Sequence, residues 1–577
     1  MTTTNGTMLQ AFSWNLPADK KHWKRLAHAA AEFEHEGITA VWMPPAYKGQ
    51  AGVDDQGYGV YDLYDLGEFD QRGTVATKYG TKEEYLEAIE ALQKRGINVL
   101  GDVVLNHRMG ADEAEEVLVV PMDPNNRWQP LVEEPPAEEP EADEPTPEVP
   151  VEDEDAGEKD EAAPDDAADA PVVDDAVEPD GPSPIPIKAW TRFTFPGRGD
   201  TYSNFTWDKS CFKAADYGEG VPDGGVYLFD GKRWDEDVDG EMGNYDYLMG
   251  VDVDVSDEHV YQELLAWGKW YLSTCGLDGF RLDAIKHISR RFFRRWLKDL
   301  REWSGKELFC VGEYWNGSVD TLRGYLGTGE EDDPIMMSLF DVPLHFKLHA
   351  ASNSMGAQDL SQLFDGTLVS QDPVHAVTFV DNHDTQPHQS LESPVELWFK
   401  PSAYAFILLR QDGYPCVFYG DLYGMPDSGL PEVAELPLLM EIRRRHAYGE
   451  QHDHIDHPNV VGWTREGDEE HEGSGLAVVL SDSEGGEKTM YVGESHAGET
   501  WSCVIGEEDD VVIGDDGQAT FRTGDGKLSV YVRADQATHL EHDRILRHSV
   551  HKQAHMTGAH ISQIVPAEVP EEAAAIE

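Results

Sequence analysis

Basic residues are scarce in this sequence of 577 residues, which has 45 Lys and Arg against 111 Asp and Glu. The net charge of −66 would repel a polyanion, so we expect no nucleic acid among the partners. Part of the excess lies in one run, because 22 Asp/Glu and a single Lys stand between Leu131 and Asp180, yet the rest of the chain still carries −45. Two interpretations are open. One is a solubility device with a disordered segment, and the other, which we favour, is adaptation to a salt-rich cytoplasm where ions screen the repulsion between carboxylates.

Cysteines and long apolar runs are also scarce. The five cysteines are scattered, and neither their odd number nor their spacing fits a disulfide framework or a metal site, which suits a reducing compartment. The apolar runs are far shorter than a bilayer span, and the first residues lack the basic and apolar regions of a signal peptide. We therefore expect a soluble, cytoplasmic protein with no membrane partner.

Apolar strands alternate with amphipathic helices over much of the chain, which favours a parallel sheet with right-handed crossovers. The third strand is predicted over Ile97–His107 and the sixth over Ile335–Leu344. Eight βα units in one domain predict a closed (β/α)8 TIM barrel. The eight strands are expected near residues 8, 40, 99, 280, 309, 338, 378 and 417.

The alternation is interrupted twice. It first fails over 108–252, where residues 129–187 are rich in Pro, Glu, Asp and Ala and are expected to be disordered. From about residue 446 onward, short strands lie between Gly and Asp turns, which predicts an antiparallel β-sandwich. The expected units are barrel domain A in two parts (1–107 and 253–445), an irregular β-rich domain B (108–252), a C-terminal β-domain (446–534) and a tail of unassigned function (535–577).

Three acids stand where barrel strands should end: Asp283, Glu313 and Asp384. Strand periodicity places Arg281 on the same face as Asp283, at a point that is costly for an apolar core. Taken singly, these residues fit a structural ion pair or helix caps. Together they should converge on one rim of the barrel, where crowded carboxylates with His and aromatic neighbours fit cleavage of a glycosidic bond.

Four segments carry a resemblance to a known family: Asp102–His107, Gly279–Asp283, Val311–Glu313 and Phe379–Asp384. In this order they resemble the four signature regions of the α-amylase family. The longer stretches are similar to the bacterial liquefying and intracellular calcium-dependent members. The resemblance covers roughly 5–128 and 187–533 and fails in the acidic insert and the tail.

The resemblance implies a role for each acid. Asp283 would be the nucleophile, Glu313 the general acid and base, and Asp384 the third acid that stabilises the transition state. Arg281 would keep Asp283 ionised. The reaction would retain configuration, with the carboxyls of Asp283 and Glu313 about 5–5.5 Å apart. The residues implied in substrate binding are Trp14, Tyr58, His107, Arg281, Lys286, His287, Trp315 and His383.

The resemblance also implies a structural Ca²⁺ that pins domain B to the barrel. Its ligands would be Asn106, Asp246, Asp252 and the backbone oxygen of His287, and oxygen ligands on loops suit this ion. Without the resemblance, surface charge explains the two aspartates equally well. Some relatives add a sodium and a second calcium. Here Asp235 and Asp254 match that pattern, whereas Ser256 and Lys213 stand where aspartates are usual, so we expect one calcium.

Three functions are compared. The first is endo-hydrolysis of α-1,4-glucosidic bonds in starch, glycogen or maltodextrins by a protein that is expected to be monomeric. The second is a maltooligosaccharide-forming or transglycosylating enzyme of the same family, which the signatures do not separate from the first. The third is a catalytically inactive glycan-binding protein, which the presence of all three acids disfavours.

Overall fold

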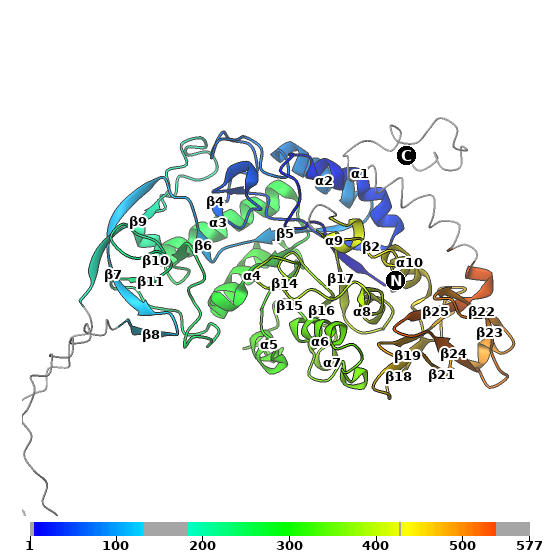
Figure 1. The fold of residues 1–577 in the computed structure, drawn as a ribbon. Coiled ribbons are helices and arrows are strands. Elements are labelled where there is room, and N and C mark those ends of the chain that lie inside the picture. Colours follow the sequence, from blue (N-terminus) through cyan, green and yellow to red (C-terminus); the bar gives the residue numbers. More distant parts are fainter. Residues whose placement is uncertain (1–4, 132–182, 426–428, 538–539, 541–577) are drawn as a thin grey trace, which may run out of the picture.

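A parallel barrel of eight strands lies at the centre of the computed structural model, which describes residues 5–131, 183–425, 429–537 and 540 (Figure 1). Its strands pair in the order β1-β17-β16-β15-β14-β13-β5-β2 and the last pairs with the first, so the predicted barrel is confirmed. The strands are β1 (Thr7–Gln10), β2 (Ile38–Trp42), β5 (Asn98–Val103), β13 (Gly279–Leu282), β14 (Phe309–Gly312), β15 (Ser338–Phe340), β16 (Ala376–Phe379) and β17 (Tyr414–Phe418).

Helices follow the barrel strands and cover the barrel from outside (Figure 1). In the helix before β13, the side chain of Asp257 accepts hydrogen bonds from the first turn, and Gly276 ends the last turn with φ +70°. The described helices are α1 (His22–His35), α2 (Lys82–Gln93), α3 (Glu258–Cys275), α4 (Arg290–Ser304), α5 (Val319–Leu326), α6 (Val342–Asn353), α7 (Leu368–Gln371), α8 (Lys400–Leu408), α9 (Tyr419–Tyr423) and α10 (Leu436–His446). No described helix is both long and apolar enough to cross a membrane.

Two predicted strands were too long. The third barrel strand stops at Val103. His107 lies in β6 (His107–Arg108), which pairs with a strand outside the barrel, so the prediction that His107 ends a barrel strand is wrong. Between these points the chain leaves the barrel. The sixth strand ends at Phe340, because Asp341 caps α6 by accepting a hydrogen bond from the backbone N–H of Leu344.

A second sheet, here called the middle sheet, lies beside the barrel, with β7, β8 and β9 at the left of Figure 1. Its strands are β6, β7 (Glu113–Asp123), β8 (Asn126–Pro130), β9 (Ile185–Arg192), β10 (Phe212–Ala215), β11 (Val226–Phe229) and β12 (Val251–Val253). A short hairpin of β3 (Lys48–Gly49) and β4 (Val60–Asp62) precedes it. The insertion after the third barrel strand is therefore β-rich, as predicted.

The predicted bounds of the disordered insert, 129–187, are wrong at both ends. Residues 129–130 belong to β8 and residues 185–187 to β9, and both strands pair with β7. Backbone pairing at the strand ends was not visible in a composition dominated by Pro and Glu. The remaining residues, 132–182, lie outside the described part of the chain, as do 541–577 of the predicted tail.

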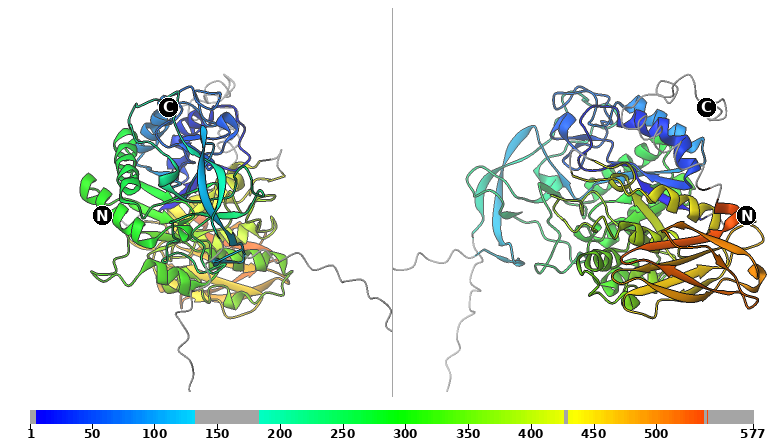
Figure 2. Two further views of the ribbon diagram at one scale, coloured as in Figure 1. Left: turned by 90° about the vertical axis from the view of Figure 1, so that its left-hand side faces the viewer. Right: turned by 45° about the vertical axis from the view of Figure 1, so that its right-hand side comes forward.

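The C-terminal strands form two facing sheets, on the side of the barrel away from β7–β9 (Figures 1 and 2). Residues such as Val479, Met490, Trp501 and Phe521 fill the space between them, which confirms the predicted sandwich. The larger sheet contains β18 (Gln451–His454), β19 (Val460–Arg465), β20 (Leu476–Ser481), β25 (Leu528–Arg533), β22 (Thr500–Ile505) and β23 (Val511–Val512), and the smaller contains β21 (Gly486–Tyr491) and β24 (Gln518–Thr523).

Candidate active site

The end of β13 is shaped by close packing and a sharp turn. A Cβ on Gly279 would meet the carbonyl oxygen of Phe309 at 1.8 Å, so only glycine lets β13 lie this close to β14. Directly after Asp283, Ala284 adopts a left-handed conformation with φ +47°, which costs about 1–2 kcal/mol for a residue with a Cβ. The turn brings the backbone N–H of Ala284 to 3.4 Å from Oε2 of Glu313.

Arg281 connects the first two predicted acids. Its side chain is fully buried, and one terminal nitrogen donates to Oδ1 of Asp283 at 2.7 Å while the other donates to Oε2 of Glu313 at 2.6 Å. The planar guanidinium therefore fixes two carboxylates from adjacent strands relative to each other. The second oxygen of Glu313, Oε1, is buried and has no hydrogen-bond partner among the described residues.

Asp102 is a fourth acid at this point, and its role was missed in the sequence. It is fully buried in β5 and accepts from Arg281 at 2.9 Å, from Nε1 of Trp42 at 2.9 Å and from the hydroxyl of Tyr58 at 2.8 Å. An aspartate inside the apolar strand Val99–Val103 was the available signal. Trp42 and Arg281 lie 60 and 179 residues away in the sequence, and Tyr58 lies on a loop, so only the folded chain identifies these partners.

Burial and nearby carboxylates raise the pKa of two of these acids. Burial raises the pKa of Asp283 well above its usual range, and although Arg281 opposes this, the neighbouring carboxylates of Glu313 and Asp102 add to it. Burial, followed by Glu313, also raises the pKa of Asp384 to about 7. Arg281 acts on Asp283 in the predicted direction, and its keeping this carboxyl ionised stays a prediction. Crowded, buried carboxyls of this kind titrate together, which favours the retention of a proton among them.

Asp384 and three rings lie on the same rim. Oδ2 of Asp384 is 3.4 Å from Nε2 of His383, whose Nδ1 accepts from the side-chain amide of Gln10 at 2.9 Å. The rings of Tyr58 and His383 stack with centroids 5.1 Å apart, and Trp14 lies parallel to Tyr58 at 5.9 Å. Trp14 and Tyr58 are half-buried and His383 is buried, and together they provide an aromatic wall beside the acids, of the kind on which a sugar ring packs.

His107 joins this wall through the backbone. Its Nε2 lies 2.9 Å from the carbonyl oxygen of Tyr58, and its Nδ1 is buried without a partner among the described residues. Burial lowers the pKa of His107, so the ring is neutral near pH 7. Although His107 is not at a barrel strand's end, the structure brings it to the predicted site.

Lys286, His287 and Trp315 form a neighbouring group. The ammonium of Lys286 donates to the carbonyl oxygen of Trp315 at 3.1 Å and to Oε2 of Glu241 at 2.8 Å. Nδ1 of His287 lies 2.7 Å from the carbonyl oxygen of Tyr245, and burial lowers the pKa of this ring to about 3. These contacts tie the turn after β13 to the loop before β12.

The predicted calcium ligands also converge. The side-chain amide of Asn106 donates to the carbonyl oxygens of Asp246 at 3.3 Å and His287 at 3.2 Å. Oδ1 of Asn106 and Oδ2 of Asp252 are buried and have no partner in the described chain. Burial and then Asp246 raise the pKa of Asp252 well above its usual value. Orphaned oxygens of this type fit a hard cation.

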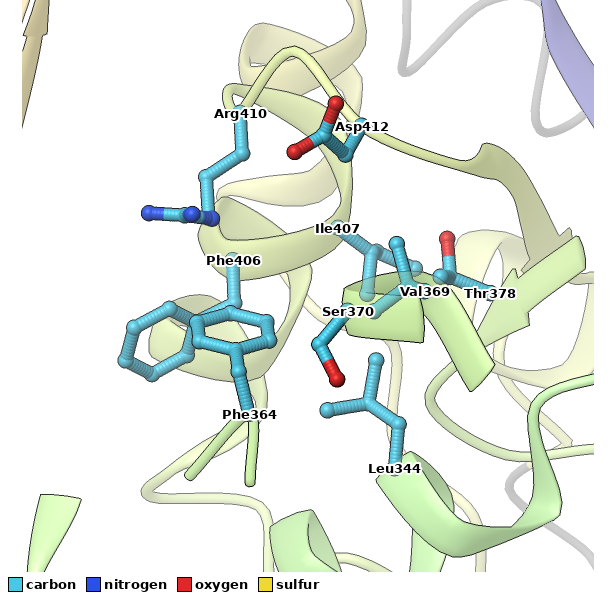
Figure 3. A pocket seen from close by; sticks show the side chains of 9 residues that line it. All are labelled: Leu344, Phe364, Val369, Ser370, Thr378, Phe406, Ile407, Arg410 and Asp412. Carbon is cyan, nitrogen blue, oxygen red and sulfur yellow. The ribbon is translucent and has the colours of Figure 1, made fainter. Parts of the chain in front are cut away.

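Two other features lie apart from these residues. A cavity of about 200 Å³ opens between α7, α8 and β16, lined by apolar side chains such as Leu344 and Phe406 with Arg410 and Asp412, and no predicted site residue lines it (Figure 3). Glu450, His452 and Glu466 of the C-terminal sandwich bring ligand atoms within 4.8 Å of one another, but His452 and Glu466 already form an ion pair.

One known protein family matches this chain. The family model described as "Alpha amylase, catalytic domain" matches residues 33–148 and 204–466. The chain belongs to the alpha-amylase family. It is therefore a glycoside hydrolase.

Relatives in the alpha-amylase family cover nearly the whole chain. "Alpha-amylase" of Bacillus licheniformis is 46% identical over 92% of this chain and 94% of its own length. "Glucan 1,4-alpha-maltohexaosidase" of Bacillus sp. (strain 707) is 45% identical over 92% of both. "Cytoplasmic alpha-amylase" of Escherichia coli (strain K12) is 41% identical over 92% and 99%. The alpha-amylase of Geobacillus thermoleovorans, solved with acarbose, shares the fold at 15% identity and a TM-score of 0.55, over 92% and 98% of the two chains.

Proposed function

We propose that this enzyme hydrolyses internal α-1,4-glucosidic bonds of starch, glycogen or maltodextrins with retention of configuration. The observation that carries the proposal is the attachment of Asp283 and Glu313 to the two terminal nitrogens of one buried guanidinium, beside a wall of stacked rings. Such a pair supplies a nucleophile and a proton donor held in fixed relation.

The acids would divide the reaction into two displacements. The carboxylate of Asp283 attacks the anomeric carbon while Glu313 passes its proton to the departing glycosidic oxygen. Water then loses a proton to Glu313 and attacks the same carbon, which releases Asp283. Asp384 holds the distorted sugar. The raised pKa of Asp384, about 7, supports a proton being kept within the group near neutral pH.

The remaining site residues would bind the glucan. Trp14 and Tyr58 provide ring faces, His107 and His383 reach sugar hydroxyls, and Arg281 orients the acids. The unpartnered Nδ1 of His107 supports this role, because a buried ring nitrogen without a partner is costly until a ligand supplies one. The product side would be lined by Lys286, His287 and Trp315.

A maltooligosaccharide-forming or transglycosylating enzyme is the second candidate. The relative named glucan 1,4-alpha-maltohexaosidase is nearly as similar as those named alpha-amylase, so overall similarity does not separate the two. Product lengths over time decide: a broad early mixture supports endo-hydrolysis, and a single early oligosaccharide supports the alternative.

One structural calcium would be held by Asn106, Asp246, Asp252 and the carbonyl oxygen of His287. The buried, unpartnered oxygens of Asn106 and Asp252 support this assignment. When bound, the ion would supply positive charge that links the middle sheet to the turn after β13. The further position suggested by Asp235 and Asp254 is not assigned a metal, because Lys213 and Lys232 already bind these side chains.

The enzyme would act as a monomer in a salt-rich cytoplasm, with domain A at 1–107 and 253–445, domain B at 108–252, the C-terminal β-domain at 446–534 and a tail at 535–577. The relative named cytoplasmic alpha-amylase and the net charge support this setting. Retention of fold and activity at low ionic strength would contradict the salt adaptation.

The decisive experiment incubates soluble starch with the enzyme and with Glu313→Gln in high KCl with Ca²⁺. Loss of the acid should lower kcat by roughly 10³-fold or more. A control, Glu307→Gln, removes an exposed glutamate just before β14 and should keep full activity. Equal activity of Glu313→Gln and the wild type would disprove the mechanism.

A further inference from the structure

A second group of buried acids surrounds Lys213 of β10, and we call it the aspartate cluster. Its members come from the loop between β11 and β12, from β12 and from the residue after it. Three of the four are strongly buried, and the fourth is about one-seventh exposed. The cluster consists of Asp235, Asp246, Asp252 and Asp254.

Lys213 is placed where an ammonium has no access to water. Its side chain is 1% exposed, and Nζ lies 2.6 Å from Oδ2 of Asp235 and 2.7 Å from Oδ2 of Asp246. Removing an ammonium from water costs several kcal/mol unless charges of opposite sign surround it. Two carboxylates lie within hydrogen-bond distance of this ammonium, so opposite charge replaces the water that burial removes.

A second lysine reaches the edge of the cluster. Nζ of Lys232 donates to Oδ2 of Asp254 at 2.8 Å, and the hydroxyl of Ser256 donates to the other oxygen of this side chain at 2.6 Å. Both oxygens of Asp254 are thus occupied. Asp235, Asp246 and Asp254 each have an ammonium partner, whereas Asp252 has none of its own among the described residues.

Two fully buried oxygens at the cluster lack a hydrogen-bond partner among the described residues. They are Oδ2 of Asp252 and Oδ1 of Asn106, both on residues that are at least 98% buried. Four carboxylates and two ammonium groups leave two negative charges, which one divalent cation would balance. A second divalent cation at Asp235 and Asp246 would have to displace the ammonium of Lys213.

We propose that Lys213 is a tethered cation that fills one cation position of the cluster and restricts it to a single divalent ion. The inference rests on the calcium site proposed above. It adds that the chain itself provides the other charge, so the loop that carries Asp235 and Asp246 is held to β10 before any metal binds. Removing the ammonium should then create a second divalent site between these two carboxylates.

The test compares wild type with Lys213→Met, which keeps most of the length of the side chain and removes its charge. Bound Ca²⁺ is measured by elemental mass spectrometry after gel filtration in high KCl, which screens weak binding at exposed carboxylates. We expect one Ca²⁺ per wild-type chain and two per variant. In a chelator the unfolding midpoint of the variant should fall by roughly 10 °C, and saturating Ca²⁺ should restore most of this loss.

Three further variants keep the test decisive. Lys213→Arg retains the charge and should bind one Ca²⁺. If Lys213→Met does not fold, Lys213→Met with Asp235→Asn removes one charge of each sign and should return to one Ca²⁺. Lys188→Met removes an exposed lysine of β9, whose ion pair with Glu219 spans 3.8 Å, and should change nothing.

Each result bears on one claim. One Ca²⁺ on both wild type and Lys213→Met, with unchanged midpoints, would overturn the role of Lys213 and leave the calcium site intact. Two Ca²⁺ on the wild type would also overturn it. No Ca²⁺ on the wild type would remove the calcium site and this inference, while activity in the Glu313→Gln comparison would still decide the hydrolytic mechanism separately.

Discussion

This enzyme has two groups of four buried acidic side chains, and the groups differ in the cations that pair with them. The proposed catalytic group (Asp102, Asp283, Glu313 and Asp384) has a single arginine, which pairs with the first three, whereas two lysines pair with the aspartate cluster. One guanidinium for four carboxyls leaves protons to be shared, which general acid catalysis needs. Two ammonium groups for four carboxylates leave room for one divalent ion instead.

The kind of cation matters as well as the number. A guanidinium donates in a plane from separate nitrogens, so Arg281 can orient Asp102, Asp283 and Glu313 at once. An ammonium is a compact charge, and Lys213 acts between two carboxylate oxygens much as a bound ion would. The comparison therefore teaches that an arginine suits an acid group that must keep its geometry during a reaction. A lysine suits an acid group in which a cation position must stay occupied.

The strongest way to break the comparison is Arg281→Met. Four buried carboxyls would then lack a cation, so we expect kcat to fall by roughly 10³-fold or more and the free energy of unfolding by about 3–5 kcal/mol. Starch hydrolysis and urea unfolding measure the two effects. Arg295→Met, which breaks an exposed pair with Glu258, serves as the control and should leave both unchanged. A fully active Arg281→Met would mean that the guanidinium of Arg281 does not position the acids.

The next largest effect is expected from Asp252→Asn, and it should change sign with calcium. The substitution removes an anionic ligand, so affinity for Ca²⁺ should fall roughly tenfold or more. It also removes a buried carboxylate without an ion-pair partner, so in a chelator the variant should unfold at a higher temperature than the wild type.

Calcium titration and thermal unfolding with and without chelator check the Asp252→Asn prediction. Asp230→Asn, at an exposed position after β11, is the matched control. If Asp252→Asn is less stable than the wild type under both conditions, Asp252 has a structural partner rather than a metal.

A smaller change is expected in the pH profile of Asp102→Asn. Because Asp102 contributes to raising the pKa of Asp384 to about 7, removing its negative charge should lower the pKa of the remaining acids. The group must hold a proton to act as an acid, so activity should be lost at a lower pH on the basic side. The pH dependence of kcat/KM tests this, and a basic limb that stays in place or moves upward would contradict it.

The smallest effect should follow from deleting residues 132–182. β11 pairs with one edge of β7, opposite Val119 to Met122. The other edge of β7 pairs with β9, where Ile185 lies opposite Val119, and with the end of β8, where Leu131 donates to Pro121. The two ends of the deletion thus lie side by side and a short link can join them. We expect unchanged kcat and calcium content, and a deletion that fails to fold would show that the segment is needed.

The sequence was sufficient for the barrel and for the three acids at its rim, because period-two strands and their polar ends are local signals. It was insufficient where a residue acquires its role from distant partners. Asp102 was read as part of a strand, and the contacts of Lys213 with Asp235 and Asp246 span 22 and 33 residues. The roles assigned to Asp283, Glu313 and Asp384 stay predictions until the variants are measured.

Two pairs of adjacent residues connect the two sites. In Asn106–His107 and Lys286–His287, one member belongs to the proposed calcium site and the other to the proposed glucan site or its product side. A ligand that orders one of these segments at one site therefore also orders it at the other site. Coupling of this kind is reciprocal. Bound oligosaccharide should raise the affinity for calcium by the same factor by which calcium raises the affinity for the oligosaccharide.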